Sequence, residues 1–263
     1  MKLDLLKQLR SENPIVFNIA NFVTAQDVAN GLNAIGALPI MSAEIQEASD
    51  MVKISSAVCL NLGTLTALQI EQMKVVGQLA NEQKKPIVFD PVAVGASSYR
   101  QSVAEALLTG FQVAVIRGNA GEIAALVGSA WQAKGIDAGT GTGDLVSIAQ
   151  ACAVKYHCIV VLSGPTDLIT DGQRMGQVNN GTQLFQLHVG SGDLLSSLVA
   201  AFTAVAPDDY FEAAQTACLV LAATGQLVAK QMTADRPGTF GIDLQDKLHL
   251  ITVKEINKIA SVR

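Results

Sequence analysis

Short apolar segments alternate with longer helical segments through most of this chain of 263 residues, and this alternation is what most restricts the possible folds. The short segments have the length of buried strands, whereas the segments between them have the length and periodicity of helices. The predicted strands are residues 15–17, 38–41, 57–62, 86–89, 113–116 and 158–162. The predicted helices between them are about 25–35, 44–53, 66–84, 100–110, one starting near Ala120, and 144–156. This order implies βαβ crossovers, and therefore a mostly parallel sheet with helices on both faces.

The last third of the chain follows a different pattern. Short β segments are predicted at 167–170, 173–178 and 183–187, separated by the turn dipeptides Asp171-Gly172 and Asn180-Gly181. They indicate an antiparallel edge of the sheet. The remaining predicted helices are 2–11, 193–205, 209–231, 239–248 and 252–261. Since no linker, repeat or change of composition divides the chain, we expect one three-layer α/β/α domain over residues 1–263.

Charge and composition exclude several classes of protein. The net charge is −5 and no basic run is present, so we expect neither nucleic acid nor a membrane as a partner. No apolar window reaches the roughly 18 residues of a membrane span, and the charged first residues do not resemble a signal peptide. We therefore expect a cytoplasmic protein. The cysteines, Cys59, Cys152, Cys158 and Cys218, lack metal-ligand spacing and are interpreted as reduced packing residues.

The stretch Gly190-Ser191-Gly192-Asp193 opens an apolar run, 194–202, that predicts a buried helix. The first amides of a helix lack internal partners and lie at the positive end of its dipole, so such a place binds anions. Asp193 beside these amides could accept a proton from a hydroxyl group. Amides of Gly190, Ser191 and Gly192 that hold a phosphoryl group, next to a base for the alcohol, are the parts of a small-molecule kinase. The alternative is a helix that Asp193 merely caps after a flexible approach.

Polar residues also gather where the predicted strands end. In open α/β sheets, ligands bind beyond the carboxyl ends of the strands. The residues at these ends are Asn18, Asn21, Met41, Ser42, Asn61, Asp90, Arg117, Asn119, Glu122, Ser163 and Gly164. Their repetition predicts a ligand site at this edge of the sheet.

Two carboxylates among these residues suggest a cation. Asp90 follows a buried strand directly, which favours a ligand of Mg²⁺, direct or through water; the alternative is a helix cap or a salt bridge in a loop. Asn119 and Glu122 stand three residues apart at a helix start, a spacing that fits both a capping box and a shared polar face. Together, Asp90 and Glu122 could hold a Mg²⁺–water cluster that shields nucleotide phosphates. Arg117 is interpreted equally well as a contact to an ATP phosphate or as an ion pair with Asp90 or Glu122.

Two other features are weaker candidates. The glycine-rich segment 139–144 lacks the Gly-Lys-Ser/Thr ending of a P-loop, so it is interpreted as a flexible loop whose Asp144 caps the next helix. His188 stands two residues before Gly190 and is a candidate for lining the site, whereas His157 and His249 are assigned to the surface or to packing.

The motifs resemble those of the hydroxyethylthiazole kinases of thiamine synthesis, which belong to the ribokinase-like superfamily. The similarity runs over nearly the full length, through Asn-Pro-Ile-Val-Phe-Asn at 13–18, Asn-Phe-Val-Thr at 21–24, Asn-Leu-Gly-Thr-Leu at 61–65, Asp-Pro-Val at 90–92, Ile-Arg-Gly-Asn at 116–119 and Arg-Pro-Gly-Thr-Phe at 236–240. The resemblance implies phosphorylation of the hydroxyl of 4-methyl-5-(2-hydroxyethyl)thiazole by ATP with Mg²⁺, in thiamine biosynthesis or salvage. It also implies a homotrimer with active sites between subunits.

The resemblance also implies roles for particular residues. Met41, Gly190 and Asn21 would lie at the thiazole alcohol; Arg117, Ser163 and Asn119 at ATP; and Asp90 and Glu122 at Mg²⁺ and the phosphates.

The chain departs from the family pattern at two places. The family loop is Thr-Gly-x-Gly-Cys, whereas this chain has Val189 in place of the threonine and Asp193 in place of the cysteine. The first change removes a hydroxyl that could contact phosphate. The second adds a carboxylate that resembles the catalytic aspartate of the wider superfamily. A carboxylate is generally ionised at pH 7, whereas an ordinary thiol, with a pKa of about 8.5, is mostly not, so the change favours proton acceptance. Ala93 replaces a common glycine and would narrow the loop near the phosphates.

Two other functions are compatible with the same fold. An ATP- or ADP-dependent dehydratase of hydrated NAD(P)H would keep nucleotide binding, but the segments around Met41 and Asn21 argue against it. The second alternative is a catalytically silent sensor that binds thiazole or nucleotide. Against this alternative stands the joint presence of Asp90, Glu122, Arg117 and Asp193.

Overall fold

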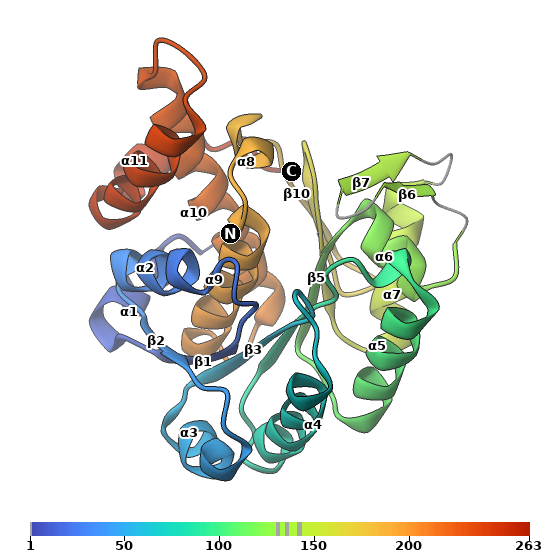
Figure 1. Ribbon diagram of the computed structural model, residues 1–263. Helices are drawn as coiled ribbons and strands as arrows, with labels where there is room; N and C mark the ends of the chain where they lie inside the picture. The colour runs from blue at the N-terminus through green and yellow to red at the C-terminus, as the bar shows by residue number, and fades with distance from the viewer. Residues whose placement is uncertain (1, 130–131, 135–136, 141–143) are drawn as a thin grey trace.

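The computed structural model describes residues 2–129, 132–134, 137–140 and 144–263. Its centre is an eight-stranded sheet in the order β10-β9-β8-β5-β4-β3-β1-β2 (Figure 1). The strands are β1 Ile15–Ile19, β2 Leu38–Met41, β3 Ala57–Asn61, β4 Ile87–Asp90, β5 Val115–Asn119, β8 Ile159–Ser163, β9 Asp167–Thr170 and β10 Met175–Val178. Six of these strands, from β2 to β8 in the sheet order, pair in parallel, whereas β9 and β10 pair antiparallel. The predicted mostly parallel sheet with an antiparallel edge is confirmed.

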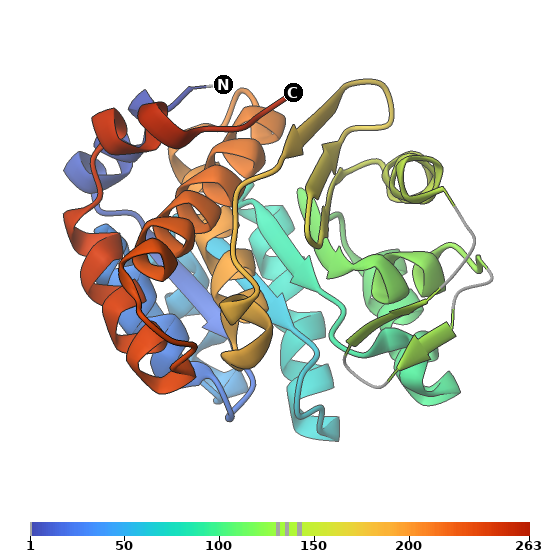
Figure 2. The ribbon, with the colours of Figure 1, turned by 90° about the horizontal axis from the view of Figure 1, so that it is seen from above.

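Helices cover both faces of this sheet, as the view from above shows (Figure 2). One hydrophobic core joins the sheet to α1, α2 and α8 to α12, and a second joins the other face to α3 to α7. The helices are α1 Asp4–Glu12, α2 Ala25–Ile35, α3 Ala48–Ile54, α4 Ala67–Glu82, α5 Ser98–Gly110, α6 Ala120–Leu126, α7 Leu145–Tyr156, α8 Leu184–Leu187, α9 Ser191–Val205, α10 Tyr210–Gln231, α11 Pro237–Leu250 and α12 Val253–Ile259. The three-layer α/β/α fold class is therefore confirmed.

Local sequence signals set several helix ends. Gly36 ends α2 with φ of 108°, a left-handed conformation that glycine adopts readily. Thr66 and Gln69 form a capping box at the start of α4. Asp144 caps α7 by accepting a hydrogen bond from the amide of Val146, as predicted. Of the segment 139–144, which was expected to be a loop, residues 139 and 140 belong to strand β7 (Asp137–Thr140), which pairs with β6 (Gln132–Lys134), and residues 141–143 lie outside the described part.

Among the described helices, α10 is long and apolar enough to cross a membrane. Its apolar window is 83% buried inside the protein, however, because it packs against α9 in the first core. The burial identifies α10 as a core helix.

The prediction of a β segment at 183–187 is wrong, because residues 184–187 form the helix α8. The Asn180 side chain bonds to Gln226 of α10 and to the carbonyl of Ile259, which directs the chain away from the sheet and onto the helices. The open edge of β10 is instead paired with the end of the chain, where Gln177 and Arg263 exchange two backbone hydrogen bonds. The helix predicted at 252–261 therefore ends earlier than expected: α12 ends at Ile259, and Val262 forms an antiparallel bridge with Val178.

Candidate active site

The helix α9 begins at the carboxyl edge of the parallel strands. Gly190 precedes it with φ of 94°, and a Cβ atom there would lie 2.8 Å from Cγ2 of Thr24, so both conformation and space require glycine. The Ser191 amide makes only a long bond of 3.4 Å to the carbonyl of His188. Asp193 lies in the first turn but its side chain makes no capping bond. The interpretation of Asp193 as a simple cap is therefore wrong.

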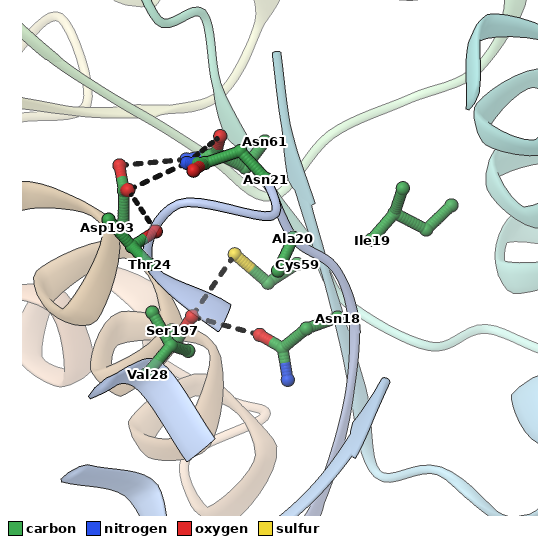
Figure 3. Close-up of a pocket in the computed structure, with 10 residues that line it drawn as sticks. All are labelled: Asn18, Ile19, Ala20, Asn21, Thr24, Val28, Cys59, Asn61, Asp193 and Ser197. Atoms are coloured by element: carbon green, nitrogen blue, oxygen red, sulfur yellow. Dashed lines mark hydrogen bonds between the residues drawn. The ribbon is translucent and has the colours of Figure 1, made fainter. Parts of the chain in front are cut away.

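The Asp193 carboxylate instead points to the loop after β1 and to the end of β3 (Figure 3). Its Oδ2 accepts hydrogen bonds from Oγ1 of Thr24 at 2.5 Å and from Nδ2 of Asn21 at 2.7 Å. Its Oδ1 accepts one from Nδ2 of Asn61 at 3.0 Å. A carboxylate offers about four lone-pair positions, so three donors fix its orientation and leave room for one further donor.

Thr24 is of a residue type that often caps a helix through its hydroxyl, but it has another role at the start of α2. Thr24 is the residue before the helix, but its hydroxyl makes no capping bond and donates to Asp193.

Asp90 lies at the end of β4 and is fully buried. Its Oδ2 accepts hydrogen bonds from Ser196 at 2.7 Å and Asn61 at 3.1 Å, and lies 3.5 Å from Nη1 of Arg117. Its Oδ1 is buried without a hydrogen-bond partner. Burial raises the pKa of Asp90 to about 7, although the neighbouring Arg117 acts in the opposite direction. The salt bridge foreseen as an alternative for Asp90 is present.

Arg117 connects this carboxylate to the next strand. Its Nη2 donates to Oγ of Ser163 at 2.6 Å, while Nη1 faces Asp90. A Cβ atom on Gly192 would lie 2.4 Å from Nη1. The guanidinium group thus lies directly against the first turn of α9.

Glu122 and Asn119 form the predicted capping box at the start of α6. Oε2 of Glu122 accepts from the Asn119 amide and Oε1 accepts from the Ala93 amide, both at 2.8 Å. Burial raises the pKa of Glu122, with Arg117 opposing the rise. Ala93 has φ of 56°, a left-handed conformation that explains why glycine suits this position. Glu122 therefore ties the loop after β4 to α6.

Two candidates lie outside this network. Met41 ends the edge strand β2, opposite Asn18 of β1, and packs against the first core. The ring of His188 packs against Phe240 at 6.2 Å between centroids, so His188 contacts α11.

All four cysteines are free and buried, and burial raises the pKa of each thiol, which agrees with packing roles.

Sequence reasoning missed two serines in α9. Ser196 donates to Asp90. Ser197 donates to Oδ1 of Asn18 at 2.8 Å, and both residues line a small cavity together with Asp193 (Figure 3). The available signal was a pair of hydroxyl residues inside an otherwise apolar run, because buried polar groups need partners. Thr24 and Asn61 were noted in the sequence without this role.

The buried Asp90 predicts that stability depends on pH. In the folded protein this carboxyl keeps its proton up to about pH 7, whereas in the unfolded chain it loses it near the ordinary value of about 3.9. The folded state then binds more protons between these values, so the contribution is full below about pH 4 and is lost as the pH rises through 7. We expect the free energy of unfolding of the wild type, relative to Asp90→Asn, to fall by at least about 1.4 kcal/mol between pH 5 and pH 8, one pKa unit or more.

Urea unfolding of both proteins at the two pH values, with a chelator present, measures this difference. Comparison with Asp90→Asn subtracts the titration of groups that the two proteins share. A difference that stays constant between pH 5 and pH 8 would show that Asp90 is ionised throughout.

The carboxyl edge of the sheet thus combines a helix start, carboxylates held by neutral donors, and an arginine. On a three-layer α/β/α fold, these features define the class of ribokinase-like small-molecule kinases and related enzymes. The profile of the hydroxyethylthiazole kinase family matches residues 6–254. The chain belongs to the hydroxyethylthiazole kinase family.

Individual relatives agree with this assignment. The chain is 71% identical to a hydroxyethylthiazole kinase of Lactiplantibacillus plantarum, and this match covers 100% of each of the two chains. It is 63% identical to a hydroxyethylthiazole kinase of Levilactobacillus brevis, and that match covers 99% of each chain. A solved hydroxyethylthiazole kinase of Pyrococcus horikoshii OT3 is 33% identical, with a TM-score of 0.91 over 100% of this chain and 99% of that one. An NAD(P)H-hydrate dehydratase of Bacillus subtilis, 12% identical with a TM-score of 0.61 over 90% of both chains, shares the fold alone. The resemblance predicted from the motifs is confirmed.

Proposed function

We propose that this protein phosphorylates the hydroxyl group of 4-methyl-5-(2-hydroxyethyl)thiazole with ATP and Mg²⁺, in thiamine biosynthesis or salvage. One observation carries the proposal: three neutral donors hold the Asp193 carboxylate in the first turn of α9 and leave room for one more donor. The substrate hydroxyl would be that fourth donor. Membership of the hydroxyethylthiazole kinase family supports the choice of alcohol.

In this proposal Asp193 accepts the proton as the hydroxyl oxygen attacks the γ-phosphorus of ATP, the bond from this phosphorus to the oxygen bridging to the β-phosphate breaks, and ADP leaves. The amides of Gly190, Ser191 and Gly192 stabilise the negative charge on the transferring phosphoryl group, together with the dipole of α9. The long bond of the Ser191 amide is weak enough to be exchanged for a phosphate oxygen.

The residues present fit a magnesium ion. Asp90 has a buried Oδ1 without a hydrogen-bond partner, and Glu122 keeps lone pairs beyond the two amides that it accepts. Within the described ranges, no group of three or more His, Cys, Asp or Glu residues is arranged to hold a metal alone. Asp90 and Glu122 would therefore organise Mg²⁺ largely through water, while the ion neutralises phosphate charge.

The remaining candidates are proposed to bind the two substrates. Asn119 ends β5 beside Ser163, which ends β8, and Arg117 lies two residues earlier in β5; these three residues would contact ATP. Gly190 and Asn21 lie at Asp193, and we assign them and Met41 to the thiazole alcohol.

We also propose a homotrimer with sites between subunits, in the cytoplasm. Apolar side chains next to the site support this arrangement: Phe22, Val23 and Val189 are exposed, Phe22 to 80%. A neighbouring subunit that covers them would close the site against water.

Release of ADP with Mg²⁺ across a panel of small alcohols tests the function. We expect the hydroxyethyl thiazole to give the fastest release and a thiazole phosphate detectable by mass spectrometry. Hydrated NADH is assayed in parallel. Loss of the hydrated cofactor without thiazole phosphate would contradict the proposal, and so would tight binding of thiazole by calorimetry without release of ADP.

A further inference from the structure

We propose that Asn61 is a positioning residue, which acts through Asp193 and holds it at a fixed place relative to Asp90. The inference rests on the proposed function, because it concerns the orientation of the base in that reaction.

Asn61 is the last residue of β3 and pairs in register with Asp90, the last residue of β4. Its side chain is buried, and the hydrogen-bonding capacity of its amide is fully used. The two N–H groups donate to Oδ2 of Asp90 and Oδ1 of Asp193, and the oxygen accepts from Nδ2 of Asn21 at 3.1 Å and from the Gly63 amide at 2.8 Å. A flipped amide would aim its oxygen at two carboxylates, so only one orientation is compatible with these neighbours.

These bonds close a ring of side chains. Asp193 and Ser196 stand three residues apart on one face of α9, and Ser196 donates to the same Oδ2 of Asp90 that Asn61 contacts. Asn61 then links Asp90 back to Asp193. The ring joins the helix that would carry the base to the strand that would carry the metal-organising carboxylate, so the two acids keep a fixed separation.

Within this ring, Asn61 has a role that its neighbours do not share. Asn21 and Thr24 both bond to Oδ2 of Asp193, whereas Asn61 is the partner of Oδ1. Without Asn61 the carboxylate is held through Oδ2 alone, so a combined change of its two side-chain torsions can rotate it about Oδ2 and shift Oδ1 while the other two donors keep their bonds. Such a rotation would move the lone pair that faces the substrate hydroxyl, and a misplacement of this kind costs up to about 100-fold in rate.

The residue type fits this role. An asparagine at the end of β3 supplies two donors and accepts two bonds in a space that is buried on all sides. Aspartate would keep the shape but would add a third carboxylate beside Asp90 and Asp193. Alanine would leave both acids without one donor each.

We expect Asn61→Ala to lower kcat by about 10- to 100-fold with KM for ATP and for the thiazole alcohol changed less than about threefold. Asn61→Asp, which keeps the shape, should lose at least as much. The matched control is Asn180→Ala, because Asn180 is also buried and its amide both donates and accepts, but its partners are Gln226, Ile259 and Ser261 and none of them belongs to the candidate site. Its kcat should stay at the wild-type value even if its melting temperature falls as far as that of the Asn61 variants.

A double-mutant cycle separates positioning from a general structural effect. If Asn61 acts through Asp193, Asn61→Ala introduced into Asp193→Asn should cause no further loss of kcat beyond about twofold. The inference is overturned if the loss is the same in both backgrounds, or if both Asn61 variants keep wild-type kcat. These outcomes are distinct from a failure of the proposed function. A wild type that makes no thiazole phosphate would refute both the proposed function and the role of Asn61. An active wild type with equally active Asn61 variants would refute only the role of Asn61.

Discussion

Asp193→Asn is expected to lower kcat by about 1,000-fold while the affinity for Mg²⁺–ATP stays within a few-fold of the wild type. Loss of a positioned general base typically costs 10²- to 10⁴-fold, and an amide of the same size cannot take the hydroxyl proton. In this variant an NH₂ group, which cannot accept a hydrogen bond, replaces one carboxylate oxygen, so at least one of the bonds from Asn21, Thr24 and Asn61 is lost. Initial rates of ADP release give kcat, and calorimetry with ATP gives the affinity.

Asp144→Asn is the control for this change. Asp144 also stands at a helix start, but its side chain caps α7, a task that asparagine performs equally well. Its variant should retain full activity. Turnover of Asp193→Asn within a few-fold of the wild type would mean that another group takes the proton or that none needs to.

Most of the fold could be predicted because most of its strands and helices have a clear local sequence pattern. Apolar strands followed by helices of crossover length leave few arrangements other than a parallel sheet covered on both faces. The segment at 183–187 failed because its few residues fit a strand or a single helical turn, and contacts of Asn180 with α10 and α12 decided between them. Short segments depend on distant partners that local patterns do not contain.

Several residues of the candidate site could be predicted, whereas Ser196, Ser197 and the connections between the residues could not. The rule that ligands bind at the carboxyl ends of strands selected Asp90, Arg117 and Glu122, and the geometry brings Asp90 and Arg117 together. The bonds that orient the carboxylates join residues far apart in sequence: Asp90 and Ser196 are 106 positions apart, and Asn61 and Asp193 are 132. A pattern within one segment carries no information on such pairs.

Gly192→Ala is expected to lower kcat/KM for ATP by about 10- to 100-fold. The new Cβ atom would lie 2.4 Å from Nη1 and 2.7 Å from Nη2 of Arg117, distances that force the guanidinium group to move. Arg117 is only 12% exposed and bonds to Ser163 at 2.6 Å, so a shift breaks this bond and the contact with Asp90. Since alanine is the better helix former, the backbone of α9 tolerates the change, and the loss is assigned to the displaced arginine.

Gly110→Ala provides the matched control, because Gly110 also lies in a helix, α5, and a Cβ atom there meets nothing within 4 Å. We expect it to keep wild-type kinetics and to raise the free energy of unfolding by up to about 1 kcal/mol, since alanine restricts the unfolded chain. Steady-state kinetics at varied ATP, with urea unfolding of each variant, measure both effects.

If Gly192→Ala keeps kcat/KM for ATP within twofold, the position of Arg117 does not matter for phosphoryl transfer and its assignment to ATP is wrong. If KM for ATP rises while kcat is unchanged, Arg117 binds ATP equally in the ground state and the transition state, whereas a fall in kcat places its charge on the transferring phosphoryl group.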